Sequence, residues 1–150
     1  MLIVRRFTAA DYPAVLALDI AEQRAYRGAV WQRATETERE GILMTSPRHR
    51  AVYADSEYCF VAEQDGAVVG FLFALPLLPD VLVVDAVGVA SVVRRRGIAG
   101  DMYAALIARA REHGIRRIQA LISLDNEASM ALHESAGFVL RDRKEAVLEL

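Results

Sequence analysis

One stretch of the sequence, residues 81–114, most constrains how the chain can fold. It begins with an almost wholly apolar segment, Val81 to Val89, whose one charged residue is Asp85. A strand of this composition is typically buried on both faces. A basic turn containing a glycine follows, and then an amphipathic helix over residues 98–113 that Gly114 would end. This succession indicates an α/β fold.

The basic turn predicts a site for an anion. It consists of Arg94, Arg95, Arg96, Gly97, Ile98 and Ala99. Because the turn opens a helix, backbone N–H groups without helical partners and the positive end of the helix dipole meet there. Gly97 would let the backbone approach an anion without an intervening Cβ, and the arginines add charge that suits a phosphate. The alternative is a solvated basic turn without a ligand.

Two motifs resemble those of the GNAT superfamily of N-acetyltransferases. In the first, R-x-x-G-x-A, the fixed places of the family's acyl-CoA pyrophosphate loop are filled by Arg94, Gly97 and Ala99, whereas Arg95 stands where many members carry glycine. The second is N-x-x-S-x-x-L-H-x-x-x-G-F, and its fixed residues are Asn126, Ser129, Leu132, His133, Gly137 and Phe138. The resemblance implies a GNAT-like fold over nearly the whole chain.

The remaining elements agree with that fold. Caps, breakers and apolar periodicity predict helices over residues 8–26, 35–44, 98–113 and 126–137. The predicted strands are 2–4, 58–62, 68–75, 81–89, 116–122, 138–140 and 146–150, with an Asp-Gly hairpin turn at 65–66 and a loop at Pro76–Pro79. We therefore expect one domain over residues 1–150, in the order β-α-α-β-β-β-α-β-α-β-β. Its fold class is α/β, with a central, mostly antiparallel mixed sheet flanked by helices.

Composition narrows the partners. The formal net charge of −2 is unlike that of a polyanion-binding protein, so nucleic acid is not expected. No apolar run is long enough to span a membrane, and a single cysteine, Cys59, cannot form an intramolecular disulfide. The three histidines have no ligand-like spacing, so no metal is expected. We expect a cytoplasmic protein.

The resemblance implies how acetyl-CoA would be held. The turn at residues 94–99 would bind its pyrophosphate through backbone N–H groups. The exposed backbone of Val87 and Val89 would pair with the pantetheine amides as an added strand does, and an N–H there would polarise the thioester carbonyl.

Asp85 is the candidate for deprotonating an acceptor amine. Counting along a regular strand puts Asp85 on the same face as Val87 and Val89. In apolar surroundings its carboxyl would have a raised pKa and would serve as a base, directly or through water. A salt bridge, or substrate contact without proton transfer, are the alternatives.

His133 is the candidate for protonating the leaving thiolate. Helical spacing places His133 on the same side as Asn126 and Ser129, the side that meets the pantetheine arm in the family. Most relatives carry a tyrosine at this place, and histidine can also supply a proton near neutral pH. Hydrogen bonding without proton transfer is the alternative role, and Tyr103 is the second candidate for the acid.

The sequence therefore predicts an N-acetyltransferase that moves an acetyl group from acetyl-CoA to a primary amine by direct attack in a ternary complex. A longer acyl-CoA as donor, or an inactive CoA-binding regulatory module, are the alternatives. The acceptor, a small molecule or a peptide amine, is left open. Homodimers are common in the family, so a homodimer is also left open.

Overall fold

The structure, a computed structural model, describes all 150 residues. Its centre is a single sheet of five strands in the order β1-β2-β3-β4-β5. The strands are β1 (Leu2–Arg6), β2 (Cys59–Gln64), β3 (Ala67–Leu78), β4 (Val81–Val89) and β5 (Arg117–Ala120). Neighbouring strands are antiparallel except β4 and β5, which are parallel. The expected mixed, mostly antiparallel sheet is confirmed.

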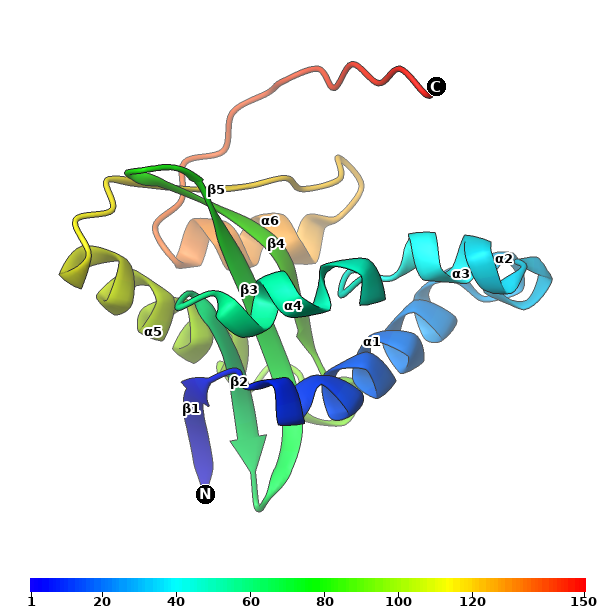
Figure 1. The fold of residues 1–150 in the computed structure, drawn as a ribbon, viewed down its shortest axis with the longest axis horizontal. Helices are drawn as coiled ribbons and strands as arrows, with labels where there is room; N and C mark the ends of the chain where they lie inside the picture. The colour runs from blue at the N-terminus through cyan, green and yellow to red at the C-terminus, as the bar shows by residue number, and fades with distance from the viewer.

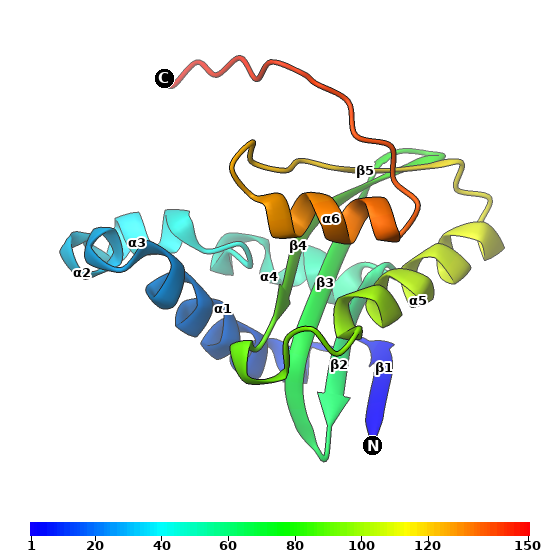
Figure 2. The same cartoon turned by 180° about the vertical axis from the view of Figure 1, so that it is seen from behind.

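Helices cover both faces of this sheet (Figures 1 and 2). One face carries α1 (Tyr12–Arg27), α2 (Ala29–Arg33), α3 (Glu36–Ile42) and α4 (Arg50–Asp55); the other carries α5 (Ile98–Glu112) and α6 (Glu127–Ser135). Short 3-10 turns lie at Ala9–Asp11, Pro47–His49 and Ser91–Val93. The α/β class expected from the sequence is therefore confirmed.

Each helical layer has its own core. Between the sheet and α5, the buried side chains include Leu72, Leu82 and Leu106. Between the sheet and α1 and α4, they include Val15, Tyr53, Phe71 and Phe73. Strand β4 supplies both cores, since Val84 belongs to the first and Ala86 to the second. This explains why its sequence is apolar almost throughout.

The hairpin between β2 and β3 follows from two residues. Asp65 and Gly66 both have positive φ, 51° and 82°. Two successive positive φ values produce the turn whose twist matches that of paired strands, and Asp-Gly is a preferred sequence for it. The predicted hairpin is confirmed.

The structure differs from the sequence-based expectations in three respects, the first of which concerns a loop. The loop predicted at Pro76–Pro79 is strand as far as Leu78. Pro76 is tolerated because β3 pairs there with β4 alone, since its pairing with β2 reaches only Phe73, and an edge strand can spare an N–H group. The second difference is that two helices, α2 and α4, were not predicted.

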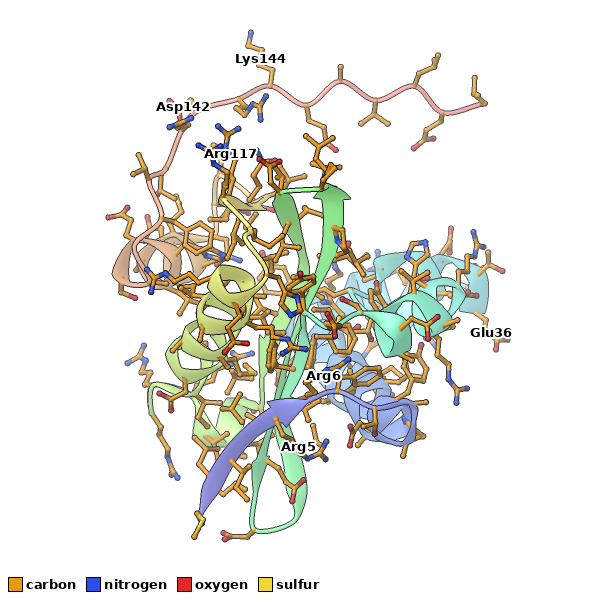
Figure 3. The ribbon with its side chains drawn as sticks, turned by 60° about the vertical axis from the view of Figure 1, so that its left-hand side comes forward. Arg5, Arg6, Glu36, Arg117, Asp142 and Lys144 are labelled. Carbon is orange, nitrogen blue, oxygen red and sulfur yellow. The ribbon has the colours of Figure 1, made fainter.

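The third difference concerns the final strand pair: strands were expected at 138–140 and 146–150, and neither forms. The chain after α6 runs away from the body as an extended segment that carries Asp142 and Lys144 (Figures 1 and 3). Strands are held by pairing, and this segment pairs with no strand of the sheet.

Strands β4 and β5 separate part-way along β4. Their pairing runs from Val81 opposite Arg117 to Val84 opposite Ala120, where β5 ends. The following part of β4, from Ala86 to Val89, keeps its pairing with β3 but has no partner on its other edge. This divergence creates an open strand edge that leads directly towards the basic turn and α5.

Candidate active site

A pocket of about 560 Å³ lies where β4 and β5 diverge. Its walls come from the C-terminal half of α1, the middle of β4, the end of β5 and the first turns of α6. Among the residues named from the sequence, it is lined by Asp85, Val87, Arg94, Asn126, Ser129 and His133. The fold thus brings together the strand edge, one residue of the basic turn and the histidine of the second motif.

The start of α5 is open to a ligand. Gly97 precedes the helix in the left-handed conformation, with φ of 78°, and no side chain caps the helix. A Cβ on Gly97 would meet no protein atom within 4 Å, so the space above the turn is free. The backbone N–H groups of Ile98, Ala99 and Gly100 have no helical partners there. The donor set and the free space fit a phosphate group.

The side chains of the turn have different places. Ile98 is buried in the core beneath α5, so only its backbone can face a ligand. Arg95 and Arg96 are exposed, and Arg95 has a positive φ of 62°. That conformation favours glycine, the residue that many relatives carry at this place.

Arg94 turns towards the pocket. Its guanidinium forms an ion pair with Glu22 of α1, and its Nε donates to the backbone oxygen of Val89 at 3.2 Å. Glu22 also accepts a hydrogen bond of 3.2 Å from the backbone N–H of Ser91. Glu22 therefore ties α1 to the segment that precedes the basic turn.

The backbone groups of Val87 and Val89 face the open edge of β4. The N–H of Ala90 bonds to Val69 of β3 at 2.8 Å, whereas the carbonyl of Val89 bonds to Arg94. Because successive residues direct their backbone groups to opposite edges, those of Val87 lie on the same side as those of Val89. An extended chain of amides could pair with this edge.

Asp85 does not share a strand face with Val87 and Val89, so that expectation is wrong. The register shifts opposite Phe73 and Ala74, which pair with Ala86 and Val84 and leave Asp85 as the extra residue of a bulge. The bulge turns Asp85 to the face of α1 and α4, where its Oδ2 accepts a hydrogen bond from the Tyr53 hydroxyl.

The surroundings of Asp85 also differ from those expected. Asp85 is exposed to the pocket rather than enclosed by apolar side chains. Tyr53 is fully buried, and burial, followed by the neighbouring carboxylate, raises the pKa of its phenol. Tyr53 therefore keeps its proton, and its hydroxyl orients Asp85 by donating a hydrogen bond to the carboxylate.

His133 and Tyr103 form one unit. The Tyr103 hydroxyl lies 2.6 Å from Nε2 of His133, and Nδ1 of His133 lies 2.7 Å from the backbone oxygen of Ser129. A carbonyl only accepts, so Nδ1 carries a proton, and in the neutral ring Nε2 accepts from Tyr103. Burial raises the pKa of Tyr103. The two residues were expected as alternatives, and the structure pairs them.

The other residues of the second motif shape the start of α6. The Asn126 side chain accepts from the backbone N–H of Ser129 at 3.0 Å and so caps the helix. Ser129 contacts His133 through both its carbonyl and its hydroxyl oxygen. Phe138 packs edge-on against the rings of Tyr103 and His133, 5.4 and 5.1 Å between ring centres.

The sequence did not identify Tyr53, Glu22 or Arg27 as residues of this region. Tyr53 reaches Asp85 from a short helix that carries no motif. Glu22 and Arg27 lie on a helix for which the sequence indicated only an apolar face. Trp31 is buried beneath Arg39 outside the pocket, so it is a packing residue rather than a pocket wall.

None of the helices is long and apolar enough to cross a lipid bilayer.

Comparison with known proteins agrees with this geometry. A family model described as "Protein of unknown function (DUF1999)" matches residues 2–150. The chain belongs to this family.

One curated relative of this DUF1999 chain is the L-2,4-diaminobutyric acid acetyltransferase of Shouchella clausii. It is 34% identical over 110 residues, which cover 69% of this chain and 59% of that enzyme. The chain thus spans less than two thirds of this relative.

Two solved structures are also similar. The ribosomal-protein-alanine N-acetyltransferase of Brucella melitensis is 32% identical, with a TM-score of 0.66 over 90% of this chain and 83% of the other. The diaminobutyrate acetyltransferase of Paenibacillus lautus, in complex with L-2,4-diaminobutyric acid and coenzyme A, is 28% identical, with a TM-score of 0.62 over 90% and 74%. The DUF1999 chain is thus a member of the GNAT superfamily, as its motifs indicated.

Proposed function

We infer that this chain is an N-acetyltransferase that moves the acetyl group of acetyl-CoA to a primary amine by direct attack in a ternary complex. The observation that carries the inference is the divergence of β4 from β5. It leaves the backbone of Val87 and Val89 open beside a pocket that also contains His133 and Asp85. The strand edge leads to the uncapped start of α5.

The donor site is built from backbone groups. The N–H groups at the start of α5 hold the pyrophosphate, and Arg95 and Arg96 add charge from the solvent side. Arg94 leaves the Val89 carbonyl when that edge pairs with an amide chain. Acetyl-CoA, when bound, supplies the acyl group as a reactive thioester. An N–H of the open β4 edge polarises the acyl carbonyl.

Asp85 accepts the proton of the acceptor ammonium, directly or through a water. An amine of the lysine type is protonated at neutral pH and must lose a proton before it can attack. The exposed carboxylate of Asp85 stands in the pocket where such an amine would arrive, and the Tyr53 hydroxyl holds its orientation. Tyr53 is therefore a positioning residue.

In its protonated form, His133 gives one proton to the departing thiolate sulfur and becomes the neutral ring, in which Nδ1 keeps its proton towards Ser129 and Nε2 accepts from Tyr103. It is the member of the Tyr103–His133 pair that lines the pocket, whereas Tyr103 lies wholly behind it. The raised pKa of Tyr103 keeps its proton in place, so Tyr103 acts by holding the ring of His133. Proton donation by a positioned group typically contributes about 10²- to 10⁴-fold to the rate.

L-2,4-diaminobutyric acid is the first acceptor to test, because relatives in both comparisons act on it. Purified protein would be incubated with acetyl-CoA and a panel of amines that includes this compound, and release of free thiol would be followed. Saturable, amine-dependent release supports the proposed activity. The absence of release with every amine, although CoA binds, would identify a CoA-binding module instead.

Two glycines that flank α5 give a matched test of the donor site. Gly97 and Gly114 lie at opposite ends of the helix, both with positive φ and with free space where a Cβ would be added. Changing either to Ala should lower the free energy of unfolding by about 1–2 kcal/mol. Only Gly97→Ala should also weaken CoA binding, by about tenfold or more in calorimetry. Equal CoA affinity in the two variants would contradict the assignment of the turn.

A further inference from the structure

A buried carboxylate on α1 has no part in the mechanism above. Asp19 is completely buried, and its Oδ2 accepts hydrogen bonds of 2.8 Å from both the backbone N–H and the hydroxyl of Thr45. Burial raises the pKa of Asp19 against the opposing effect of these hydrogen bonds. Burying a carboxylate costs free energy of folding, so the hydrogen bonds of Asp19 indicate which residues it helps to position.

Asp19 is the inner end of a polar line along α1. The amide nitrogen of Gln23 lies 3.5 Å from Asp19 Oδ1, and the amide oxygen of Gln23 accepts from Nε of Arg27 at 3.2 Å. The three residues are spaced by four and therefore lie along one side of the helix. Gln23 is also buried, whereas Arg27 is exposed at the pocket. The line fixes the guanidinium of Arg27 at its Nε atom.

The terminal nitrogens of Arg27 are free. Nε is the only atom of its guanidinium with a hydrogen-bond partner, and no acidic side chain lies within ion-pair distance of it. Its one further contact is the Tyr26 ring, 5.9 Å away. The planar pair of N–H groups that suits a carboxylate is thus held in position without a partner.

The charges of the pocket indicate what kind of ligand it fits. Four charged residues line it, and two of these, Glu22 and Arg94, neutralise each other. The remaining two are the cation Arg27 and the anion Asp85, which is bonded to the neutral hydroxyl of Tyr53. A ligand that carries both an ammonium and a carboxylate would satisfy both groups.

We propose that the acceptor is an amino acid with a second amine on its side chain, whose carboxylate is bound by Arg27 while an ammonium faces Asp85. Asp19 and Gln23 are then positioning residues that hold Arg27 by its Nε atom. This inference rests on the proposed function, since it names the acceptor of the same pocket.

Matched acceptors with and without a carboxylate test it. L-2,4-diaminobutyrate would be compared with 1,3-diaminopropane, and L-lysine with cadaverine, by calorimetric titration into protein saturated with CoA. Wild type should bind at least one of the two amino acids about 10- to 100-fold more tightly than its decarboxylated partner, the range for a hydrogen bond to a charged group. Arg27→Gln should abolish this preference and leave diamine affinity unchanged.

Two further variants separate a specific from a general effect. Arg24→Gln makes the same charge change on the same helix outside the pocket and should keep the preference. Gln23→Met should reduce the preference in part without changing CoA affinity, because it frees Arg27 without removing its charge.

The outcomes are distinct. Equal affinity for amino acid and diamine in the wild type, a preference that survives Arg27→Gln, or no binding of any of the four compounds would each overturn the inference. Thiol release with acetyl-CoA is read separately. A carboxylate preference that depends on Arg27, without any acetyl transfer, would leave the inference standing and refute the proposed function.

Discussion

At the scale of single residues, the proposed chemistry depends on side chains held by buried partners. His133 is only 2% exposed, and each of its ring nitrogens has a partner. Asp85 is exposed but is bonded to the buried Tyr53. In both cases a tyrosine with a raised pKa stands behind the group that is proposed to move a proton. Such a tyrosine can orient its partner without exchanging a proton with it.

The roles within the Tyr103–His133 pair are separable by mutation. His133→Ala should lower kcat by about 10²- to 10⁴-fold and leave CoA affinity nearly intact, because it removes the proton donor. Tyr103→Phe removes one neutral hydrogen bond and should lower kcat by about 2- to 10-fold.

The contrary results are equally clear. Full kcat in His133→Ala would remove His133 from the mechanism. A larger loss of kcat in Tyr103→Phe than in His133→Ala would make Tyr103 the acid.

Arg95 occupies a conformation that suits glycine better than arginine. Because its φ is 62°, Arg95→Gly should raise the free energy of unfolding by about 0.5–1 kcal/mol. Arg96 has no positive φ and is the control, because Arg96→Gly should leave stability unchanged or lower it. Urea denaturation measures both, and equal losses in the two variants would show that the turn does not strain Arg95.

At the scale of elements, β4 and α5 could be predicted almost to the residue. The strand was expected at 81–89 and is found there, and the helix expected at 98–113 ends at Glu112. Both are determined by signals within the segment: a continuous apolar run, a glycine turn and a helical apolar stripe. The two motifs, in contrast, were expected at one site because of their resemblance to the GNAT superfamily, and Arg94 of the first and Asn126, Ser129 and His133 of the second do line one pocket.

The bulge at Asp85 could not be predicted, because it depends on the register against β3. Regular alternation put Asp85 on the wrong face, and its partner Tyr53 lies 32 residues earlier in the chain. The last two strands were expected from β-branched and apolar residues. Composition, however, does not supply a pairing partner, and Val139 and Leu148 are exposed.

Gly88 shows how closely β4 is packed beside the open edge. A Cβ at Gly88 would lie 2.6 Å from the Phe71 ring, which is buried in the core beneath α1. Gly88→Ala should therefore lower the free energy of unfolding by about 1–3 kcal/mol through overpacking. Gly41 lies in α3 with free space around it, so Gly41→Ala should instead raise stability by about 0.5–1 kcal/mol. A neutral Gly88→Ala would mean that Phe71 can move aside.

At the scale of the whole molecule, the carboxyl groups of Asp11 and Asp19 should make the free energy of unfolding depend on pH in opposite directions. Asp11 accepts two hydrogen bonds, of 2.7 and 2.9 Å, from Arg5 of β1, which also bonds to Glu63 of β2 (Figure 3 labels Arg5). The Arg5 hydrogen bonds, more than any other contact, lower the pKa of Asp11 to about 2. Burial, in contrast, raises the pKa of Asp19.

Linkage between protonation and folding sets the two directions. A carboxyl whose pKa is lower in the folded state stabilises the fold above its ordinary pKa, and this contribution is lost as the pH falls. Asp11 should therefore contribute fully above about pH 4 and lose its contribution towards the pKa of about 2. A carboxyl with a raised folded-state pKa contributes below its ordinary pKa, and this contribution is lost as the pH rises. For Asp19 the loss should begin near pH 4.

The free energy of unfolding, measured with urea from pH 2 to 7, should separate the two residues. Asp11→Asn should cost about 1 kcal/mol at pH 7, a modest value because Arg5 is partly exposed and solvent screens the pair. Its difference from wild type should shrink below about pH 4. Asp19→Asn keeps an oxygen to accept from Thr45, so it should gain stability relative to wild type as the pH rises from about 4. Parallel curves for the two variants would show that these carboxyl groups do not control the stability of the molecule in acid.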